Sequence, residues 1–188
     1  MKKNFGLLIL FSLLVTAVSA QKLKGKIDFL KGQEEVNLVF DFSNLSVNGK
    51  SVDRYIKDRT NKKSEEETAS WIAEWEGSAR DGFKELYTKY CNDELDKFDV
   101  GVFPDAEYTI IVKIDDIDPG NFAGPFSNPA KIKSTVNIIK TGEETILASI
   151  TGNDDYNNYA LLPVEFHRIT AGFGEAGKEL AKFLNKKL

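Results

Sequence analysis

The chain has 188 residues, of which 41% are hydrophobic, and it carries a net charge of −4 at pH 7. This acidic balance argues against a nucleic-acid partner, which is usually bound through a basic surface, and against electrostatic docking to anionic lipid. A single cysteine excludes an intramolecular disulfide, and a single histidine excludes a metal site built from several histidines.

Residues 1–20 have the pattern of a secretory signal peptide. Two lysines precede an apolar run over 7–15, and small side chains lead to Ala20. The run is too short to span a bilayer comfortably, so an uncleaved membrane anchor is the less favoured interpretation. We expect an exported protein, periplasmic or secreted, with one domain over 21–188 and no stable membrane insertion after signal cleavage. Cleavage removes two lysines and no acid, so the net charge of −4 becomes −6.

Alternating apolar and polar residues predict strands early in the mature chain. Residues 22–29 and 36–44 both alternate, with a turn at Gly32 between them, and are predicted to pair as a hairpin. An Asn-Gly pair at 48–49 marks another tight turn. The polar run 53–63 is predicted to be a loop with a short helical turn.

A long helix is predicted to begin at Ser64, which has capping-box spacing to Glu67. From Trp71 to Tyr90, apolar residues recur every three to four positions, which predicts one continuous buried stripe. Its two tryptophans could be mistaken for a ligand cage, but core packing is the favoured interpretation at this spacing. Cys91 near the helix end is expected to be a partly buried and inert thiol.

The stretch 107–117 has the clearest strand pattern, because its even-numbered residues from Tyr108 to Ile114 are all apolar. Residues 99–105 are predicted to be a connector leading into it. Residues 132–138 and 146–150 alternate on either side of a turn, which predicts a hairpin. From about residue 164 the apolar period becomes helical and predicts a C-terminal helix.

Together these elements predict one two-layer α+β domain. We expect a mostly antiparallel sheet of about five strands, with two long helices packed on one face. The segment from Val36 through the first long helix to Tyr108 could form a crossover, which would make its two strands parallel neighbours.

Three short patterns have chemical interpretations that the rest of the sequence does not support. Residues 172–177 match the dinucleotide fingerprint letter for letter, yet no second strand follows to hold a ribose. We interpret these glycines as small residues that let the helix approach the sheet closely. His167 is interpreted as structural, since no Gly-x-Ser-x-Gly nucleophile elbow is present. Asp115, Asp116 and Asp118 could bind a cation, but their spacing misses the EF-hand pattern, so solvated carboxylates are favoured.

Two predicted loops are the candidate binding surfaces. The loop 119–129, rich in Gly, Pro and Asn, carries Phe122 and Phe126. These rings either fold back onto the sheet edge or form an exposed contact site. A second loop is predicted over 152–163, and its residues suited to sugar binding are Asp154, Asp155, Tyr156 and Tyr159.

Residues 39–44, Val-Phe-Asp-Phe-Ser-Asn, resemble the opening strand of the TolB amino-terminal domain type. The tail Gly-Glu-Ala-Gly-Lys-Glu-Leu-Ala-Lys-Phe-Leu at 174–184 and the strand 108–119 are similar to small exported Bacteroidetes proteins of unknown function. The signal-peptide end before Gln21 is also similar to secreted proteins of that phylum. The resemblance covers most of the mature chain. It implies a cell-envelope α+β domain with an accessory or binding role, and it implies no reaction and no family active site.

The leading functional hypothesis is a non-catalytic exported binding or interaction module, with an envelope protein as the candidate partner. We expect no enzyme activity, no cofactor and no metal site. The first alternative is a small-molecule or glycan-binding protein that uses the second loop. The other is a carboxylate-based hydrolase that uses the acids at 115–118. The oligomeric state does not follow from the sequence.

Overall fold

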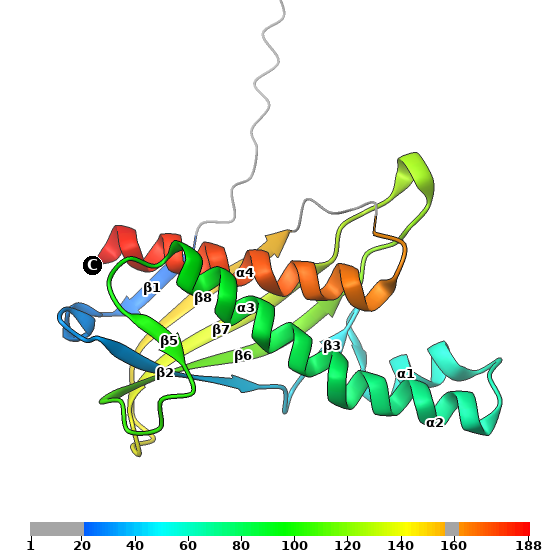
Figure 1. Ribbon diagram of the computed structural model, residues 1–188, viewed down its shortest axis with the longest axis horizontal. Helices are drawn as coiled ribbons and strands as arrows, with labels where there is room; N and C mark the ends of the chain where they lie inside the picture. The colour runs from blue at the N-terminus through cyan, green and yellow to red at the C-terminus, as the bar shows by residue number, and fades with distance from the viewer. Residues whose placement is uncertain (1–20, 157–161) are drawn as a thin grey trace, which may run out of the picture.

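The computed structural model describes residues 21–156 and 162–188, so the predicted signal peptide lies outside the described residues. The described chain is an α+β domain built on one mixed, eight-stranded sheet (Figure 1). The strands are Lys22–Gly25 (β1), Glu35–Asp41 (β2), Ser46–Val47 (β3), Lys50–Ser51 (β4), Asp99–Gly101 (β5), Tyr108–Asp118 (β6), Lys131–Lys140 (β7) and Ile146–Tyr156 (β8). The helices are Val52–Thr60 (α1), Glu65–Glu74 (α2), Arg80–Glu94 (α3) and Glu165–Lys187 (α4).

The main sheet has the order β1-β8-β7-β6-β2-β5, and β3 lies beside the far end of β6. β2 pairs in parallel with both β5 and β6, whereas β1, β8, β7 and β6 are antiparallel neighbours. The predicted α+β class is confirmed. The expected mostly antiparallel sheet of about five strands is not quite what forms, because β3, β4 and β5 are too short to show a period of two in the sequence.

β6 lies in the interior of the sheet, and its alternating sequence places one face on the core. Ile110, Val112 and Ile114 are fully buried on the face toward the helices. The parallel crossover is also confirmed, since β2 aligns Leu38 with Ile110. The predicted hairpin of the first two strands is wrong, because β1 pairs with β8 at the opposite side of the sheet. Gly25 ends β1 with a positive φ of 92°, and the chain then leaves the β1 edge through a 3-10 turn.

The segment predicted as a loop over 53–63 is mainly helix α1. Its N-cap is Ser51, whose hydroxyl accepts a hydrogen bond from the Arg54 N–H. The helix is mostly polar and buries Tyr55 and Thr60, which explains why its sequence shows no apolar stripe. The Asn-Gly turn before it is confirmed, with positive φ at both residues.

The long predicted helix forms as α2, one π-helical turn over Trp75–Ala79, and α3. Its capping box is present: the Ser64 hydroxyl accepts from the Glu67 N–H, and the Glu67 carboxylate accepts from the Ser64 N–H at 2.8 Å. Trp75 is fully buried and stacks on Trp71 with ring centroids 6.0 Å apart. The core interpretation of the tryptophan pair is therefore confirmed.

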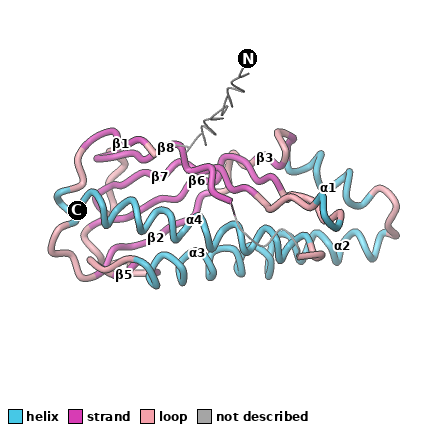
Figure 2. The backbone as a smooth tube through the Cα atoms, turned by 90° about the horizontal axis from the view of Figure 1, so that it is seen from above, coloured by secondary structure: helices cyan, strands magenta, loops and turns pink. Residues whose placement is uncertain are grey.

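Helices α3 and α4 lie side by side on one face of the sheet, while the α1–α2 arm extends beyond it (Figure 2). The glycines of the 172–177 segment explain this close arrangement. A Cβ placed on Gly172 would lie 3.2 Å from the Ile132 side chain in the sheet, and one on Gly177 would lie 2.2 Å from the Tyr87 carbonyl oxygen in α3. The interpretation of these glycines as packing residues is confirmed, and it extends from the sheet to the neighbouring helix.

Cys91 has no exposed surface, and burial raises the pKa of its thiol to about 12. The thiol is therefore neutral and inaccessible at pH 8. We expect no reaction with a charged disulfide reagent in the native state and one equivalent after unfolding in denaturant. A native reaction as fast as that of free cysteine would contradict this burial.

Candidate binding surfaces

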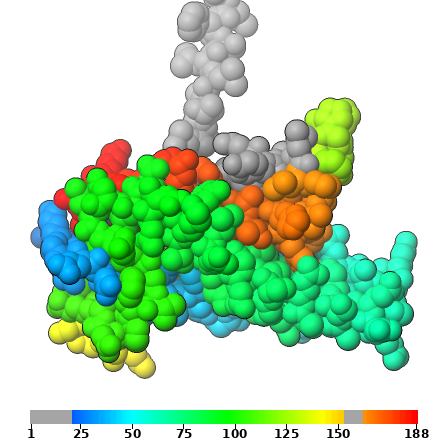
Figure 3. Space-filling model, viewed as in Figure 1, coloured from blue at the N-terminus to red at the C-terminus, as the bar shows by residue number. Residues whose placement is uncertain are grey.

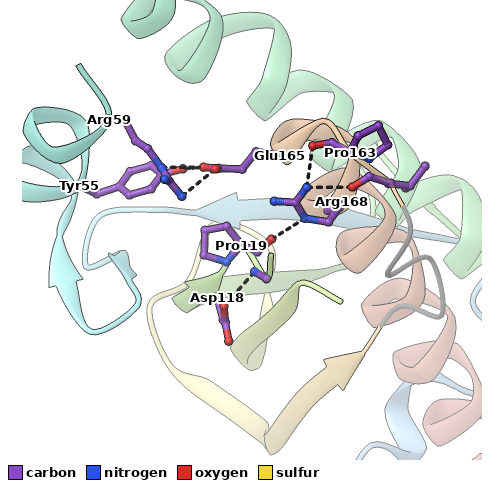
Figure 4. A network of polar contacts seen from close by, with 9 residues as sticks. Tyr55, Arg59, Asp118, Pro119, Pro163, Glu165 and Arg168 are labelled. Atoms are coloured by element: carbon purple, nitrogen blue, oxygen red, sulfur yellow. Dashed lines mark hydrogen bonds and ion pairs between the residues drawn. The ribbon is translucent and has the colours of Figure 1, made fainter. Parts of the chain in front are cut away.

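The loop after β6 is anchored at its base by Arg168, which is only 4% exposed. Its Nε donates to the Pro119 carbonyl oxygen at 3.1 Å (Figure 4). Its Nη1 donates to the carbonyl oxygens of Leu162 and Pro163 at 2.8 and 2.9 Å. This guanidinium therefore fastens the loop base and the segment before α4 to one point on that helix.

A second polar contact ties the α1–α2 arm to the start of α4 (Figure 4). The Tyr55 hydroxyl donates to the Glu165 carboxylate, and Arg59 pairs with that carboxylate at 2.7 Å between Nη2 and Oε2. Burial, and then the negative charge of Glu165, raise the pKa of Tyr55, so the phenol remains a hydrogen-bond donor. This contact gives the arm a fixed position beside the loop anchor.

The loop 119–130 stands away from the body near the start of α4 (Figure 3). Asn121 and Asn128 close its stem, each donating a backbone N–H to the other's carbonyl oxygen at 3.1 Å. Beyond them Phe122 is 50% exposed and Phe126 is 80% exposed. These rings do not fold back onto the sheet edge, so the loop presents the exposed aromatic surface that the other interpretation describes.

The second predicted loop is partly strand, since β8 continues to Tyr156. The backbones of Asp154, Asp155 and Tyr156 pair with the first residues of β7, and Tyr156 lies opposite Lys131. Strand pairing thus brings this segment beside the end of the first loop. Tyr159 lies outside the described residues.

The acids of β6 each bind to the chain itself. Asp115 accepts a hydrogen bond from the Thr135 hydroxyl at 2.8 Å, and Asp116 accepts from the Gly49 N–H at 3.0 Å. Asp118 accepts from the Gly120 N–H at 2.9 Å. Across residues 21–156 and 162–188, no three His, Cys, Asp or Glu side chains are grouped to hold a metal ion. His167 is exposed on the first turn of α4 and adds nothing to the buried core.

An apolar groove of about 780 Å³, which no sequence pattern predicts, lies between β2, α3 and the segment after β5. Leu38 and Phe40 of β2, Lys84 and Thr88 of α3, and Val102 are among its lining residues. Val102 is 87% exposed. An isolated valine in the predicted connector is too weak a signal to identify this groove from sequence.

The groove runs beside a backbone edge that is only partly paired. β5 pairs with β2 from Glu35 to Asn37 and then ends. The Glu34 carbonyl oxygen accepts from the Asp99 N–H at 2.9 Å, so alternation directs the N–H and carbonyl of Phe40 to this same edge. Among the described residues, β2 has no strand partner on that side beyond Asn37. An unpaired edge of this kind is a template for another strand.

In the described part of the chain, no helix is both long enough and apolar enough to cross a membrane. No protein-family model matches the sequence, and no curated protein is similar to it at a significant level.

Two solved structures show a distant similarity in backbone arrangement. One is a single-residue variant of the PelC dodecamer from Paraburkholderia phytofirmans, with a TM-score of 0.42, 9% identity, and coverage of 86% of this chain and 98% of that chain. The other is the PelC dodecamer from the same organism, with a TM-score of 0.39, 6% identity, and coverage of 85% and 96%. Because both TM-scores lie under 0.5, the similarity assigns no family and no function to this chain.

Proposed function

We propose that the protein is an exported, non-catalytic module that binds an extended peptide segment of a partner protein along the free edge of β2. The observation that carries this proposal is that β2 has no strand partner on its β5 side beyond Asn37, where Phe40 turns its N–H and carbonyl toward an apolar groove. A peptide added there can form main-chain hydrogen bonds with β2, while every second side chain enters the groove.

The groove favours an uncharged peptide with alternating apolar side chains. Two lysines line its α3 side, and both are already paired: Lys84 with Asp81 at 2.7 Å, and Lys89 with Asp93. Their charge is therefore balanced within α3, and the exposed groove surface is mainly apolar. An acidic peptide would gain little from these lysines, whereas apolar side chains would lose contact with water.

A second copy of this chain is the less favoured occupant. The part of β2 that lacks a partner on its β5 side is four residues long, about 13 Å of strand, and past Leu38 only Phe40 turns both its N–H and its carbonyl to that side. Pairing two such edges would bury much less than the roughly 1,200–2,000 Å² of a stable protein interface. A separate flexible peptide can fill the groove as well as pair with the edge.

We expect a display library of linear peptides to yield binders with apolar residues at alternate positions. A Thr88→Trp variant should lose them, because the indole would occupy the groove beside β2. The matched control is Lys57→Trp, which places the same side chain on the exposed surface of α1. Binding is measured by fluorescence anisotropy, and both variants are first checked for an unchanged melting temperature.

Main-chain recognition is tested with a selected peptide that is N-methylated at alternate residues. Methylation of the N–H groups that face β2 should abolish binding, and methylation of the intervening ones should not. The proposal is wrong if no alternating sequence is enriched, or if Thr88→Trp binds the peptides as well as wild type does.

A further inference from the structure

A second hollow, of about 580 Å³, lies at the opposite end of β6 from the start of the β2 groove. It forms where the β3–β4 turn, the stem of the 119–130 loop and the first residue of β7 converge. Its volume falls within the roughly 300–1,000 Å³ that is usual for small-molecule sites. The polar residues that line it are Asn48, Asp118, Asn121, Asn128 and Lys131.

The backbone around this hollow is held in place by several contacts. Asn48 has a left-handed backbone (φ 53°), and its N–H donates to the Ile117 carbonyl oxygen at 2.9 Å. Gly120 also has a positive φ, of 63°, and a Cβ placed on it would lie 2.4 Å from the Asn128 carbonyl oxygen. Arg168 anchors the preceding residue, Pro119. The hollow is therefore formed before any ligand enters.

Its polar side chains offer both donors and acceptors to a ligand. The Asn121 Oδ1 accepts from the Asn128 N–H and Nδ2 at 2.8 and 3.1 Å, and these two bonds do not use the Asn121 amide nitrogen or the Asn128 amide oxygen. Asp118 uses one carboxylate oxygen for the Gly120 N–H and has a second. Asn48 adds a further amide at the rim.

The charges of the residues that line the hollow disfavour anionic and cationic ligands. One carboxylate and one ammonium group balance each other, so neither a phosphate nor a divalent cation is favoured. Three amides and a carboxylate can instead satisfy neighbouring hydroxyl groups, each of which both donates and accepts. The exposed rings of Phe122 and Phe126 are carried by the same loop but do not line the hollow, so its amides and its carboxylate carry the recognition.

We propose that this hollow binds a neutral carbohydrate, with the amides of Asn48, Asn121 and Asn128 contacting the hydroxyl groups. The site is separate from the β2 groove and does not depend on peptide binding there. It also differs from the sugar site predicted over residues 154–159, although β8 runs beside it.

The probes are maltose, cellobiose and diacetylchitobiose, titrated into the mature protein and followed by calorimetry and by amide chemical shifts. At least one should bind saturably and shift the amides of the 119–130 loop. Asn48→Gly keeps the left-handed backbone and removes one amide, so we expect it to weaken binding by about tenfold. Asn61→Gly, on the exposed end of α1, is the matched control and should leave binding unchanged.

Phe126→Ala leaves every hydrogen bond of the stem in place and removes a ring that does not line the hollow, so it should leave binding of the same disaccharide unchanged. Inorganic phosphate and Ca²⁺ are titrated separately and should neither bind saturably nor compete. The proposal is overturned if none of the three sugars saturates, if Asn48→Gly and Asn61→Gly bind equally well, or if phosphate or Ca²⁺ displaces the sugar. Peptide binding at the β2 groove should be unaffected in the Asn48→Gly, Asn61→Gly and Phe126→Ala variants. The outcome of the sugar titrations is therefore independent of the test of the β2 groove.

Discussion

Replacing Gly177 with alanine is expected to destabilise the protein by at least about 2 kcal/mol. The added methyl group would lie 2.2 Å from the Tyr87 carbonyl oxygen and 2.9 Å from its carbonyl carbon. Both atoms belong to the backbone of α3, so relief requires the two helices to separate. Alanine also favours the helix over glycine by about 1 kcal/mol, but overpacking against a rigid backbone outweighs that gain.

The measurement is urea unfolding of the mature chain, with the thermal midpoint as a second readout. For a chain of this size, each kcal/mol corresponds to roughly 2–4 °C, so the midpoint should fall by about 4 °C or more. Gly174→Ala should cost less, because its methyl group meets the side chains of Leu86 and Tyr90 at 3.0 Å, and these can move.

Gly82→Ala is the matched control in the partner helix. A Cβ placed on Gly82 meets nothing within 4 Å, so only helix propensity changes. This variant should therefore be more stable than wild type, by up to about 1 kcal/mol. If Gly177→Ala and Gly82→Ala changed stability in the same direction, the close contact between α3 and α4 would not exist in solution.

The glycines illustrate how far sequence reasoning reaches in this protein. They are interpreted as small residues that let the helix approach the sheet, because no second strand follows to complete a nucleotide site. Gly172 bears this out against the sheet, whereas Gly177 meets the backbone of α3. The partner of each glycine could not be predicted, because it depends on how α4 lies across α3. The same is true of the π-helical turn at Trp75–Ala79, which keeps the apolar stripe and leaves no distinct period in the sequence.

The sheet was predictable where its strands are long and was missed where they are short. β6, β7 and the first half of β8 show clear alternation, and the pairing of β7 with β8 follows from the short turn between them. β5 has three residues and therefore looked like a connector. The β2 groove could not be anticipated for that reason, since the free edge exists only because β5 ends after Gly101.

Some of the candidate site residues could be identified from the sequence and others could not. Phe122 and Phe126 were identifiable because an irregular loop offers aromatic rings little local core, and both are exposed. Asp154 to Tyr156 were misplaced in a loop because polar residues at the end of β8 hide its alternation. The polar hollow draws its residues from three separate segments, so no local pattern could reveal it.

Arg168→Met is expected to destabilise the protein by roughly 3 kcal/mol. Methionine has a similar length and fits an apolar setting, but it cannot donate to the carbonyl oxygens of Pro119, Leu162 and Pro163. These acceptors would lose a charged donor that is itself only 4% exposed. Leaving a buried acceptor unsatisfied costs about 1–3 kcal/mol, and here the contact to Pro119 is buried while those to Leu162 and Pro163 are part-buried, so their joint loss places the effect near the upper end.

The region that loses hydrogen-exchange protection in Arg168→Met distinguishes loop anchoring by Arg168 from general core packing. Hydrogen exchange should accelerate at the Asn121 and Asn128 backbone amides, because Arg168 fixes the base of their loop. In the buried strand β6, amide exchange should change only by the amount that the lower global stability accounts for. Arg54→Met is the control, since Arg54 is 61% exposed in its ion pair with Asp58 and should contribute less than about 1 kcal/mol. Equal stability losses in the two variants, or unchanged exchange in the loop stem, would show that Arg168 does not hold the loop. Carbohydrate binding should weaken in Arg168→Met even at temperatures where it remains folded, because the hollow depends on a stem that this side chain fastens to α4.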